Sequence, residues 1–582
     1  MEHQPGEARV AYFSMEIALD PAIPTYAGGL GILAGDMLRS AADLGVPMVA
    51  VTLIHRKGYF RQRLDEHGNQ KQEPASWMPE AVLEPVDVEV PVTVEGRQVL
   101  LGAWRYSLRG ITGHVVPVYL LDAALPPNDA WDQRLTDFLY SGDNHYRLCQ
   151  EVLLGLGGVE MLDKLGYTEI TSYHMNEGHS ALLALALIEE QLRGRSVESI
   201  KEDDMEAVRR QCIFTTHTPV PAGHDQYDPQ LARQVLGDAR TRLLEGTNCC
   251  HGGMLNMTYL ALRCSHYING VAMRHGEVSR GMYPRFPIHA ITNGVHAVTW
   301  TSPPFQELYD RHIPEWRHDN LYLRYAIGIS LDEIRAAHLR AKRALLEEVT
   351  RRTGVALDEA ILTIGFARRA TTYKRADLLF SNLERLRTIA RLVGPMQVVY
   401  GGKAHPDDEG GKALIRRVFE AAAALHPLVR VIYVEDYDMA WAKLICAGVD
   451  LWLNTPKRPE EASGTSGMKA ALNGVPSFSV PDGWWIEGCL EGVTGWAIGR
   501  DGGLIEEESS EVASLYDKLE RVILPVFYGQ PTAYAEVMRS AIALNGSFFN
   551  TERMVTQYQF NAYFPEEPLE RWAPNGALAA RK

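Results

Sequence analysis

Cysteine is scarce in this sequence, and none of the cysteines has the spacing of a redox or zinc motif. Seven cysteines occur in 582 residues, with no C-x-x-C pair among them. A sparse, odd-numbered set in a long chain is typical of reduced thiols in a cytoplasm. Cys249 and Cys250 are adjacent, and we interpret them as buried or idle thiols.

A long apolar run, a secretory leader and an excess of positive charge are also missing. No apolar stretch approaches the roughly 18–20 residues that span a bilayer. The first residues, MEHQPGEARVAYFSMEIAL, lack the charged and apolar regions of a signal peptide. The net charge is −15, from 58 basic and 73 acidic residues, which argues against a nucleic-acid or anionic-membrane partner. We therefore expect a cytoplasmic protein with neither kind of partner.

Short apolar strands alternate with helical segments along most of the chain. This alternation predicts an α/β fold whose parallel sheets are covered by helices on both faces. Two stretches, 98–106 and 113–122, are instead typical of an antiparallel insertion. The expected parallel strands are 8–13, 46–54, 211–219 and 288–295 in the first half, and 360–367, 396–402, 429–434, 450–454 and 475–480 in the second.

The length and the two series of strands indicate two large domains. We expect both to be Rossmann-like and doubly wound, facing each other across a cleft, with ligands at the carboxyl ends of the strands. The first domain is predicted at 1–297 and the second at 298–545. A final helical segment, 546–582, is predicted to cross back to the first domain.

Two segments combine glycine or positive charge with the end of a predicted strand or the start of a helix. The stretch YAGGLGILAGD (26–36) carries Gly28 and Gly29 before a helix, where backbone N–H groups can approach an anion. The stretch RRATTYKR (368–375) places four cations after the strand 360–367. A tight turn explains the first equally well, and a solvated basic turn explains the second. The position at a strand's carboxyl end favours an oxyanion site.

The stretch EASGTSGMKAALNG (461–474) reads as the start of a helix that carries a lysine, Lys469, near its first turn. Backbone N–H groups from 464 to 467, with the hydroxyls of Ser463 and Thr465, would face an anion there. Lys469 is then either a cation paired with a bound anion or an uncharged Schiff-base lysine. Its apolar neighbours disfavour the more common role of a solvated surface cation.

Polar residues embedded in apolar segments are a further feature of the sequence. Their histidines do not have metal-ligand spacing: His174 and His179 would not share a helix face, and His217 and His224 lack a third ligand. We therefore expect no metal, and interpret these segments as strand-end loops that line a sugar pocket. The segments are GDN (142–144), HMNEGH (174–179), THTP (216–219), SHYINGVA (265–272) and TNG (292–294).

Several of these motifs together resemble the α-glucan phosphorylase family (glycogen, starch and maltodextrin phosphorylases), in particular its short prokaryotic-type branch. The motifs are EASGTSGMKAALNG, RRATTYKR, GGKAHP (401–406), SHYINGVA, TNG and AGGLG, and the similarity extends from about residue 10 to 500. The resemblance implies the GT-B architecture of a glycosyltransferase. It also implies pyridoxal 5′-phosphate (PLP), joined to Lys469 as a Schiff base. The implied reaction is reversible, retaining phosphorolysis of α-1,4-glucans, which yields α-glucose 1-phosphate.

The resemblance further implies roles for individual residues, because in that family the PLP phosphate lies against the substrate phosphate and relays a proton. By motif, the catalytic set is Lys469, Arg369, Lys374, His266 and Thr465. The cofactor-binding set is Lys469, Arg368, Thr465, Gly467 and Gly464. The substrate-binding set is Gly28, Gly29, Asn144, His266, Asn293, Tyr373, Glu461, Ser463 and Gly464, with Gly29 on the phosphate and most of the others on glucose.

Two residues depart from the pattern of the long phosphorylases. Asp438 stands where an arginine is expected near the cofactor phosphate, and Arg368 stands where lysine is more usual. The chain also begins close to the glycine loop, so the N-terminal regulatory region of animal members has no counterpart. We expect no allosteric control of that kind. A homodimer is a candidate assembly, without contacts from that region.

Other functions remain as alternatives. A nucleotide-sugar glucosyltransferase of the same fold, such as a glycogen synthase, would have a second acid eight positions after Glu461, where this chain has Lys469. A non-catalytic glucan-binding protein would be expected to have lost some of the site residues, and all are present. A glycoside hydrolase needs a carboxylate pair, and no spacing supports candidates such as Glu177 or Asp143.

Overall fold

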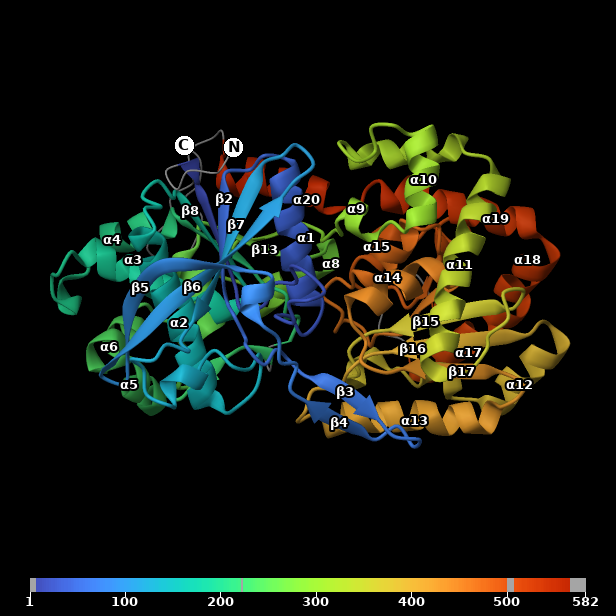
Figure 1. Ribbon diagram of the computed structural model, residues 1–582, viewed down its shortest axis with the longest axis horizontal. Coiled ribbons are helices and arrows are strands. Elements are labelled where there is room, and N and C mark those ends of the chain that lie inside the picture. Colours follow the sequence, from blue (N-terminus) through green and yellow to red (C-terminus); the bar gives the residue numbers. More distant parts are fainter. Residues whose placement is uncertain (1–6, 221–222, 500–506, 566–582) are drawn as a thin grey trace. The chain divides into compact units, whose positions relative to one another are not determined.

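The computed structural model describes residues 7–220, 223–499 and 507–565, and its elements are labelled in Figure 1. By internal contacts the chain divides into two compact units. Unit 1 contains the described residues of Met1–Phe60, Pro74–Ile291 and Met554–Lys582, and unit 2 contains those of Arg61–Glu73 and Thr292–Arg553. The chain thus passes to unit 2 at 291/292 and back at 553/554, whereas the sequence placed these boundaries at 297/298 and 545/546.

Unit 1 is built on a nine-stranded sheet in the order β14-β13-β9-β8-β1-β2-β7-β6-β5. Strand β1 pairs parallel with β2 on one side and β8 on the other. The predicted antiparallel pair is β6 and β7, and it extends the parallel sheet because β7 also pairs parallel with β2. The strands are β1 (Val10–Ser14), β2 (Met48–Leu53), β5 (Glu84–Val94), β6 (Arg97–Arg109), β7 (Val115–Asp122), β8 (Ser172–Asn176), β9 (Cys212–Thr215), β13 (Tyr267–Gly270) and β14 (Ile288–Ala290).

Both faces of this sheet are buried, as the sequence predicted for its parallel strands. Ala11 and Phe13 of β1 face a core that includes α2 (Asn144–Lys164) and α3 (Leu182–Leu192). Val10 and Tyr12 face the opposite core. Since successive side chains of a strand point to opposite faces, a strand with two buried faces must be apolar throughout.

The second core contains α1 (Gly29–Asp43) and residues from the other end of the sequence, in α20 (Thr551–Tyr558) and the π-helical turn Gln559–Tyr563. The Tyr563 hydroxyl forms a 2.7 Å hydrogen bond with His174 Nδ1, and the Tyr558 hydroxyl lies 3.0 Å from Thr215 Oγ1. The last described segment is therefore part of the core of unit 1. The remaining elements of unit 1 are α4 (Glu202–Arg209), α5 (Pro229–Leu236), α6 (Asp238–Gly246), α7 (Met257–Cys264), α8 (Met273–Met282) and the small sheet of β10 (Gln226–Tyr227), β11 (Cys250–His251) and β12 (Met254–Asn256).

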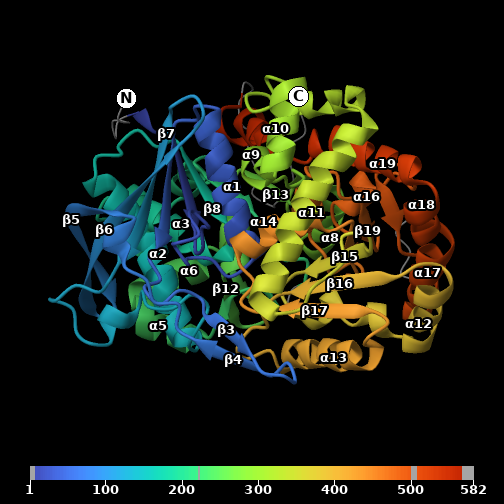
Figure 2. The ribbon, with the colours of Figure 1, turned by 45° about the vertical axis from the view of Figure 1, so that its right-hand side comes forward.

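Unit 2 contains a six-stranded sheet, parallel throughout, in the order β17-β16-β15-β18-β19-β20. This order starts from the middle of the sheet and reverses direction between β15 and β18, as in the doubly wound fold. Figure 2 shows β15, β16 and β17 side by side. The strands are β15 (Leu362–Ala367), β16 (Met396–Gly401), β17 (Arg430–Val434), β18 (Leu451–Asn454), β19 (Ser477–Ser479) and β20 (Gly495–Ala497).

The long helix α11 (Leu331–Thr353) packs against α14 (Met439–Gly448) and the core of unit 2. The ammonium group of Lys342 donates to Asp450 Oδ2 at 2.6 Å, and His338 Nε2 lies 2.9 Å from Asp450 Oδ1. All three residues are buried, so a buried charged triad holds the helix to the start of β18.

The other elements of unit 2 connect these strands or flank them. The hairpin of β3 (Arg61–Leu64) and β4 (Gln70–Glu73) also belongs to this unit. The helices are α9 (Ala297–Trp300), α10 (Pro303–His312), α12 (Leu383–Leu392), α13 (Glu409–Leu425), α15 (Ser466–Ala471), α16 (Trp485–Gly488), α17 (Glu508–Lys518), α18 (Leu524–Gly529) and α19 (Pro531–Ser540), with a 3₁₀ segment at Asn320–Gly328. In the part of the chain that the structure describes, no helix is long and apolar enough to cross a membrane.

Candidate functional site

Several predicted site residues lie on the loops where each sheet reverses its strand order. His266 does not: it precedes β13, and its amide donates to the carbonyl of Cys212, the first residue of β9, so it lies at the amino end of these parallel strands. In unit 2 the reversal lies between β15 and β18, and the loops that follow these strands carry 368–375 and 455–465. In unit 1 it lies between β1 and β8, and the loops after them carry Glu16 and Glu177. Ligands of open α/β sheets bind at such switch points, because the two loops diverge there.

A buried carboxylate joins two of the predicted cations in unit 2. Arg368 Nη2 donates to Glu461 Oε2 at 2.6 Å, and Lys374 Nζ donates to the same oxygen. Burial opposes ionisation, but the two cations lower the pKa of Glu461 to about 2. The carboxylate is therefore ionised at neutral pH, and the cluster carries one more positive charge than negative.

Three buried polar atoms of predicted site residues have no hydrogen-bond partner in the described chain: Arg368 Nη1, Ser463 Oγ and Asn293 Oδ1. Buried polar groups in proteins are nearly always hydrogen-bonded, so unpaired ones indicate a place that a ligand satisfies. All three belong to unit 2 and to the predicted site sets.

The loops 368–375 and 455–461 are fastened to each other through backbone groups. Arg375, which has a positive φ of 46°, donates from Nε to the Thr455 carbonyl at 2.9 Å. The Lys457 amide donates to the Tyr373 carbonyl at 2.7 Å. The ammonium group of Lys374 lies 4.3 Å from the centre of the Tyr373 ring. Arg369 is exposed on the same loop, where it can reach a ligand outside the buried cluster.

Lys469 is buried, with 7% of its surface exposed. It lies in the last turn of α15, which has six residues. The sequence placed it near the first turn of a helix that begins in this stretch. Its ammonium group lies 3.9 Å from the centre of the Trp300 ring. The amine is thus largely removed from water, a setting in which lysine chemistry is altered.

Glycine is favoured at two positions before Lys469, for a different structural reason at each. Gly464 has a positive φ of 78°, which favours glycine. A Cβ on Gly467 would lie 2.7 Å from both Ser477 Oγ and the Trp484 ring, so only glycine fits. Thr465 is the N-cap residue of α15, but its hydroxyl makes no capping bond.

Asp438, where the family pattern has arginine, has a structural role. Its side chain accepts a 2.9 Å hydrogen bond from the Trp441 amide and caps α14. A capping aspartate stabilises a helix start by its hydrogen bond and its charge.

Asp482 is a site residue that the sequence did not reveal. It accepts hydrogen bonds from the amides of Glu461 at 2.9 Å and Gly483 at 3.0 Å. Burial, and the nearby charge of Glu461, raise the pKa of Asp482 to about 7 although backbone hydrogen bonds oppose this. An acid whose pKa lies close to neutrality is typical of functional sites. The only sequence signal was its position just after the strand 475–480.

In unit 1 the glycine loop already binds a carboxylate. Glu16 Oε2 accepts from the amides of Ala27 at 2.6 Å and Gly28 at 3.3 Å, and its Oε1 accepts from the Tyr140 hydroxyl at 3.1 Å. Helix α1 begins at Gly29, where a Cβ would meet no atom within 4 Å. The loop is therefore open beside Gly29, while the amide of Gly28 is held by Glu16.

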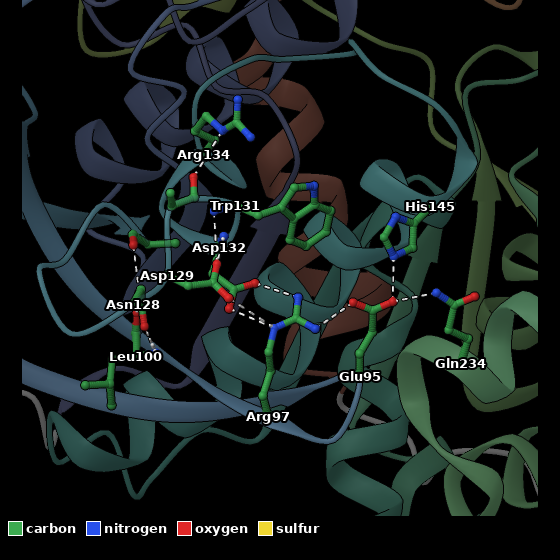
Figure 3. Close-up of polar contacts among 12 residues, drawn as sticks. Glu95, Arg97, Leu100, Asn128, Asp129, Trp131, Asp132, Arg134, His145 and Gln234 are labelled. Carbon is green, nitrogen blue, oxygen red and sulfur yellow. Dashed lines mark hydrogen bonds and ion pairs between the residues drawn. The ribbon is translucent and has the colours of Figure 1, made fainter.

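Asn144 is the exposed first residue of α2, whose N-cap is Asp143. A charged network holds this end of the helix (Figure 3): His145 Nε2 lies 2.8 Å from Glu95 Oε1, and Arg97 donates to Glu95 Oε2 at 2.7 Å. Arg97 also donates to both oxygens of Asp132, at 2.8 and 2.9 Å. The start of α2 is thus braced by the turn between β5 and β6.

The sequence drew attention to HMNEGH and THTP but left their residues out of the predicted site. His217 Nε2 lies 2.6 Å from Asn176 Oδ1, and the His217 amide donates to Glu177 Oε2 at 2.7 Å. Burial lowers the pKa of His217 to about 3 and that of the predicted His266 to about 4. Both imidazoles are therefore neutral at pH 7 and available as hydrogen-bond donors or acceptors. The usable signal was the position of THTP at the carboxyl end of a strand.

Metal binding has no support in the part of the chain that the structure describes, where no group of three or more histidine, cysteine, aspartate or glutamate residues is placed to hold an ion. The loops at the two switch points offer buried cations and unpaired hydrogen-bonding groups, and the neutral His217 contacts Glu177 in one of them. These features define an α/β enzyme whose ligands are anionic and polar.

Comparison with known proteins identifies the family. Residues 224–493 match the carbohydrate phosphorylase family model. The chain is 38% identical to the maltodextrin phosphorylase of Thermococcus litoralis, over 95% of this chain and 70% of the relative. It is 36% identical to a glycogen phosphorylase of Mycobacterium tuberculosis (96% and 71%) and 35% identical to one of Aquifex aeolicus (94% and 85%). The chain belongs to the carbohydrate phosphorylase family, which confirms the resemblance seen in the sequence, and it is a glycosyltransferase of that family.

Proposed function

We propose that this enzyme catalyses the reversible, retaining phosphorolysis of α-1,4-glucans such as maltodextrin and glycogen, with PLP carried by Lys469. The observation that carries the proposal is the buried cluster of Arg368, Lys374 and Glu461 with its unpaired Arg368 Nη1. We further propose the GT-B arrangement, in which the switch points of the two units face each other. The cysteines form no disulfide in the described part of the chain and are mostly buried, which supports the proposed cytoplasmic location.

The residues present fit PLP. Lys469 offers a buried amine against an indole ring, Gly467 leaves space that a side chain would fill, and Arg368 Nη1 is an unused cationic donor. The residues that would hold the group are Lys469, Arg368, Thr465, Gly467 and Gly464. When bound, PLP would supply a phosphate group that relays a proton to and from the substrate phosphate.

The cations of this chain would solve the main electrostatic problem of the reaction, which is to bring two phosphates together. Arg369, Lys374, Thr465 and the backbone at Gly29 would hold orthophosphate, while Arg368 balances the charge of the cofactor. Charge-assisted hydrogen bonds in a water-poor site are strong enough to offset such repulsion. Because Lys374 is already paired with Glu461, the glutamate would keep it oriented before phosphate binds.

The polar groups would bind and orient the reacting glucose. The proposed set is Asn293, Tyr373, Glu461, Ser463 and Gly464 of unit 2, with Asn144 and His266 of unit 1. Ser463 Oγ can donate or accept a hydrogen bond, and Asn293 Oδ1 can accept one. Orthophosphate would give a proton to the glycosidic oxygen and bond to the anomeric carbon as the glycosidic bond breaks. The products are α-glucose 1-phosphate and a glucan shortened by one unit.

Two measurements test the cofactor and the reaction separately. An absorbance spectrum of the purified protein before and after borohydride reduction, followed by peptide mapping, is expected to place PLP on Lys469. Release of glucose 1-phosphate from maltodextrin and phosphate tests the activity. Absence of any label on Lys469 would overturn the cofactor assignment, and turnover of UDP- or ADP-glucose without phosphate would favour the glucosyltransferase alternative.

The variant Lys469→Ala sharpens the test. It is expected to abolish turnover while the protein retains its circular dichroism spectrum, since the lysine lies in a short helix whose neighbours fill the core. Lys457→Ala, an exposed lysine of the same region, is the matched control and is expected to keep normal activity. Substantial turnover by Lys469→Ala would show that the role of this residue is misassigned.

A further inference from the structure

The hairpin of β3 and β4 belongs to unit 2, although the residues on either side of it belong to unit 1. Its strands pair antiparallel, with Gln62 opposite Gln72 and Leu64 opposite Gln70. Figures 1 and 2 both show it beside α13, and a Cβ on Gly68 would lie 2.6 Å from the ring of Phe419 in that helix. The hairpin is thus tightly packed within unit 2.

Two glutamine side chains of the hairpin are buried and bond to each other. Gln62 is fully buried and Gln70 is 9% exposed. Gln62 Nε2 donates to Gln70 Oε1 at 2.8 Å and to the Gly402 carbonyl at 2.9 Å. Gln70 Nε2 donates to the Ala404 carbonyl at 2.9 Å, and its Oε1 accepts from the Ala404 amide at 3.0 Å. Because buried amides need such partners, the pair fixes the backbone at 402–404.

The backbone of residues 401–404 lies, in turn, directly against the segment that carries Arg368 and Arg369. The Arg368 amide donates to the Gly401 carbonyl at 3.0 Å, and the Ala370 amide donates to the Lys403 carbonyl at 2.9 Å. Gly402 has a φ of 145°, and a Cβ there would lie 1.8 Å from the Arg368 carbonyl oxygen. A displacement of 401–404 would therefore move the arginine segment as well.

The hairpin also holds the loop that precedes α14. The Gln62 amide donates to Asp436 Oδ1 at 3.0 Å, and the Asp436 amide donates to Gln62 Oε1 at 3.1 Å. Lys403 Nζ pairs with the same Asp436 oxygen at 2.6 Å. Both polar atoms of the Gln62 side-chain amide are therefore hydrogen-bonded. A fully bonded buried network of this kind is typical of a site with one fixed geometry.

We propose that Gln62 and Gln70 are positioning residues for the phosphate-binding segment 368–370, acting through the backbone of 401–404. The proposal rests on the proposed function, in which Arg369 binds orthophosphate. Loss of the Gln70 amide leaves the N–H and carbonyl groups of Ala404 without this partner. Loss of the Gln62 amide leaves the Gly402 carbonyl bonded to the Tyr433 hydroxyl alone. In both cases the segment 402–404 shifts. Phosphate binding then weakens. The groups proposed to bind glucose at 461–464 move less, because the Glu461 amide is held by Asp482 and the Ser463 carbonyl by the Trp484 amide, although the Glu461 side chain also contacts Arg368.

The test uses Gln62→Met and Gln70→Met, which keep the length of the side chain and remove its amide. Gln72→Met is the matched control, because Gln72 is exposed on the same strand as Gln70. We expect the KM for phosphate to rise about tenfold in each buried variant, with kcat and the KM for maltodextrin changing less than about twofold. The control is expected to match the wild-type protein in all three constants.

Equal rises in the KM values for phosphate and maltodextrin, or unchanged constants in both buried variants, would overturn the proposal. If the methionine variants do not fold, Gln70→Glu takes their place, since it keeps an acceptor for the Ala404 amide and replaces the donor to the Ala404 carbonyl with an oxygen of an ionisable carboxyl group. A wild-type KM for phosphate in Gln70→Glu would then count against a positioning role.

A wild-type protein that releases no glucose 1-phosphate would overturn the proposed function and not, by itself, the positioning role. In that case the rise in Tm on adding inorganic phosphate is compared between the wild-type protein and Gln70→Met, or Gln70→Glu if the methionine variant does not fold. A larger rise in the wild-type protein supports positioning of an anion site, and equal rises, or none, overturn it.

Discussion

Arg368 and Lys374 both donate to one oxygen of Glu461, Oε2, and this shared oxygen links the two loops at the switch point of unit 2. The first cation follows β15, and the glutamate follows β18. The pairing explains how a strongly buried carboxylate stays ionised. It also means that the site is charged and oriented before any ligand arrives.

The first prediction concerns the pH dependence of stability that this cluster provides. The folded pKa of Glu461, about 2, lies below its ordinary value of 4.5, so the ionised group stabilises the folded state above pH 4.5. That contribution is lost as the pH falls from 4.5 towards 2. Glu461→Gln removes it and is expected to cost about 3 kcal/mol in the free energy of unfolding at pH 7.

Urea unfolding of wild-type and Glu461→Gln proteins between pH 7 and 2.5 measures this effect. The difference between the two free energies should shrink as the pH falls. Glu460→Gln provides the control, because Glu460 pairs with Lys457, which is largely exposed, and it should change stability little. A difference that is the same at every pH would show that Glu461 contributes by packing and not by charge.

The second prediction concerns Asp482. With a folded pKa of about 7, its carboxyl is neutral below that pH and becomes an anion as the pH rises through it. The new charge lies beside Glu461 and repels a bound phosphate. We therefore expect the KM for phosphate to rise above pH 7 in the wild-type enzyme more steeply than in Asp482→Asn.

Steady-state kinetics from pH 6 to 8.5 measures the KM for phosphate of the wild-type enzyme and of Asp482→Asn. Dividing one KM by the other cancels the effect of the titration of phosphate itself. A ratio that does not change across pH 7 would rule out ionisation of Asp482 in this range. Asp407→Asn is the control, since Asp407 is exposed.

The third prediction concerns the buried triad of Lys342, His338 and Asp450. Asp450→Asn removes the only acid of the triad and leaves the Lys342 ammonium group buried beside a neutral amide. Removal of one partner from a buried pair destabilises a protein by about 3–5 kcal/mol. The comparison is the exposed pair of Arg343, on the same helix, and Glu359, which follows that helix, and Glu359→Gln should cost less than about 1 kcal/mol. Chemical denaturation of both variants measures the contrast, and similar losses would contradict it.

The fourth prediction concerns the network drawn in Figure 3, which braces the start of α2. His145→Leu removes the bond to Glu95 Oε1 and lets the first turn of the helix, with Asn144, move. If Asn144 binds glucose, the KM for maltodextrin should rise about threefold to tenfold while the KM for phosphate is unchanged. Gln98→Leu, on an exposed part of β6, is the control. A change in the phosphate constant alone would contradict the role of Asn144.

The sequence predicted most of the parallel strands, because a strand buried on both faces is usually apolar. Strands β8, β13 and β20 were not among the predicted strands. In β8, His174 and Asn176 are polar although the strand is buried. Their partners, Tyr563, Thr215 and Ser14, are distant in sequence, so no local pattern could reveal that these polar side chains are satisfied inside the core.

Contacts between residues distant in sequence also explain why other features were not predicted. The hairpin of β3 and β4 has almost no apolar residues, and its burial depends on Gln62 and Gln70 bonding to residues more than three hundred positions away. The motif around Lys469 could be identified by resemblance. The hydrogen bonds that Arg368 and Lys374 both donate to Glu461 could not be predicted from the sequence. The raised pKa of Asp482 follows from burial, which a linear sequence does not display.

The way the chain alternates between its two units has a consequence for biosynthesis. The hairpin 61–73 leaves the ribosome long before the β16 loop that it binds, and the core around Val10 and Tyr12 includes Met554, Val555 and Tyr558, which are made much later. One face of the sheet of unit 1 therefore stays uncovered until these residues have been made. Nascent chains halted near residue 540 should remain protease-sensitive and depend on chaperones.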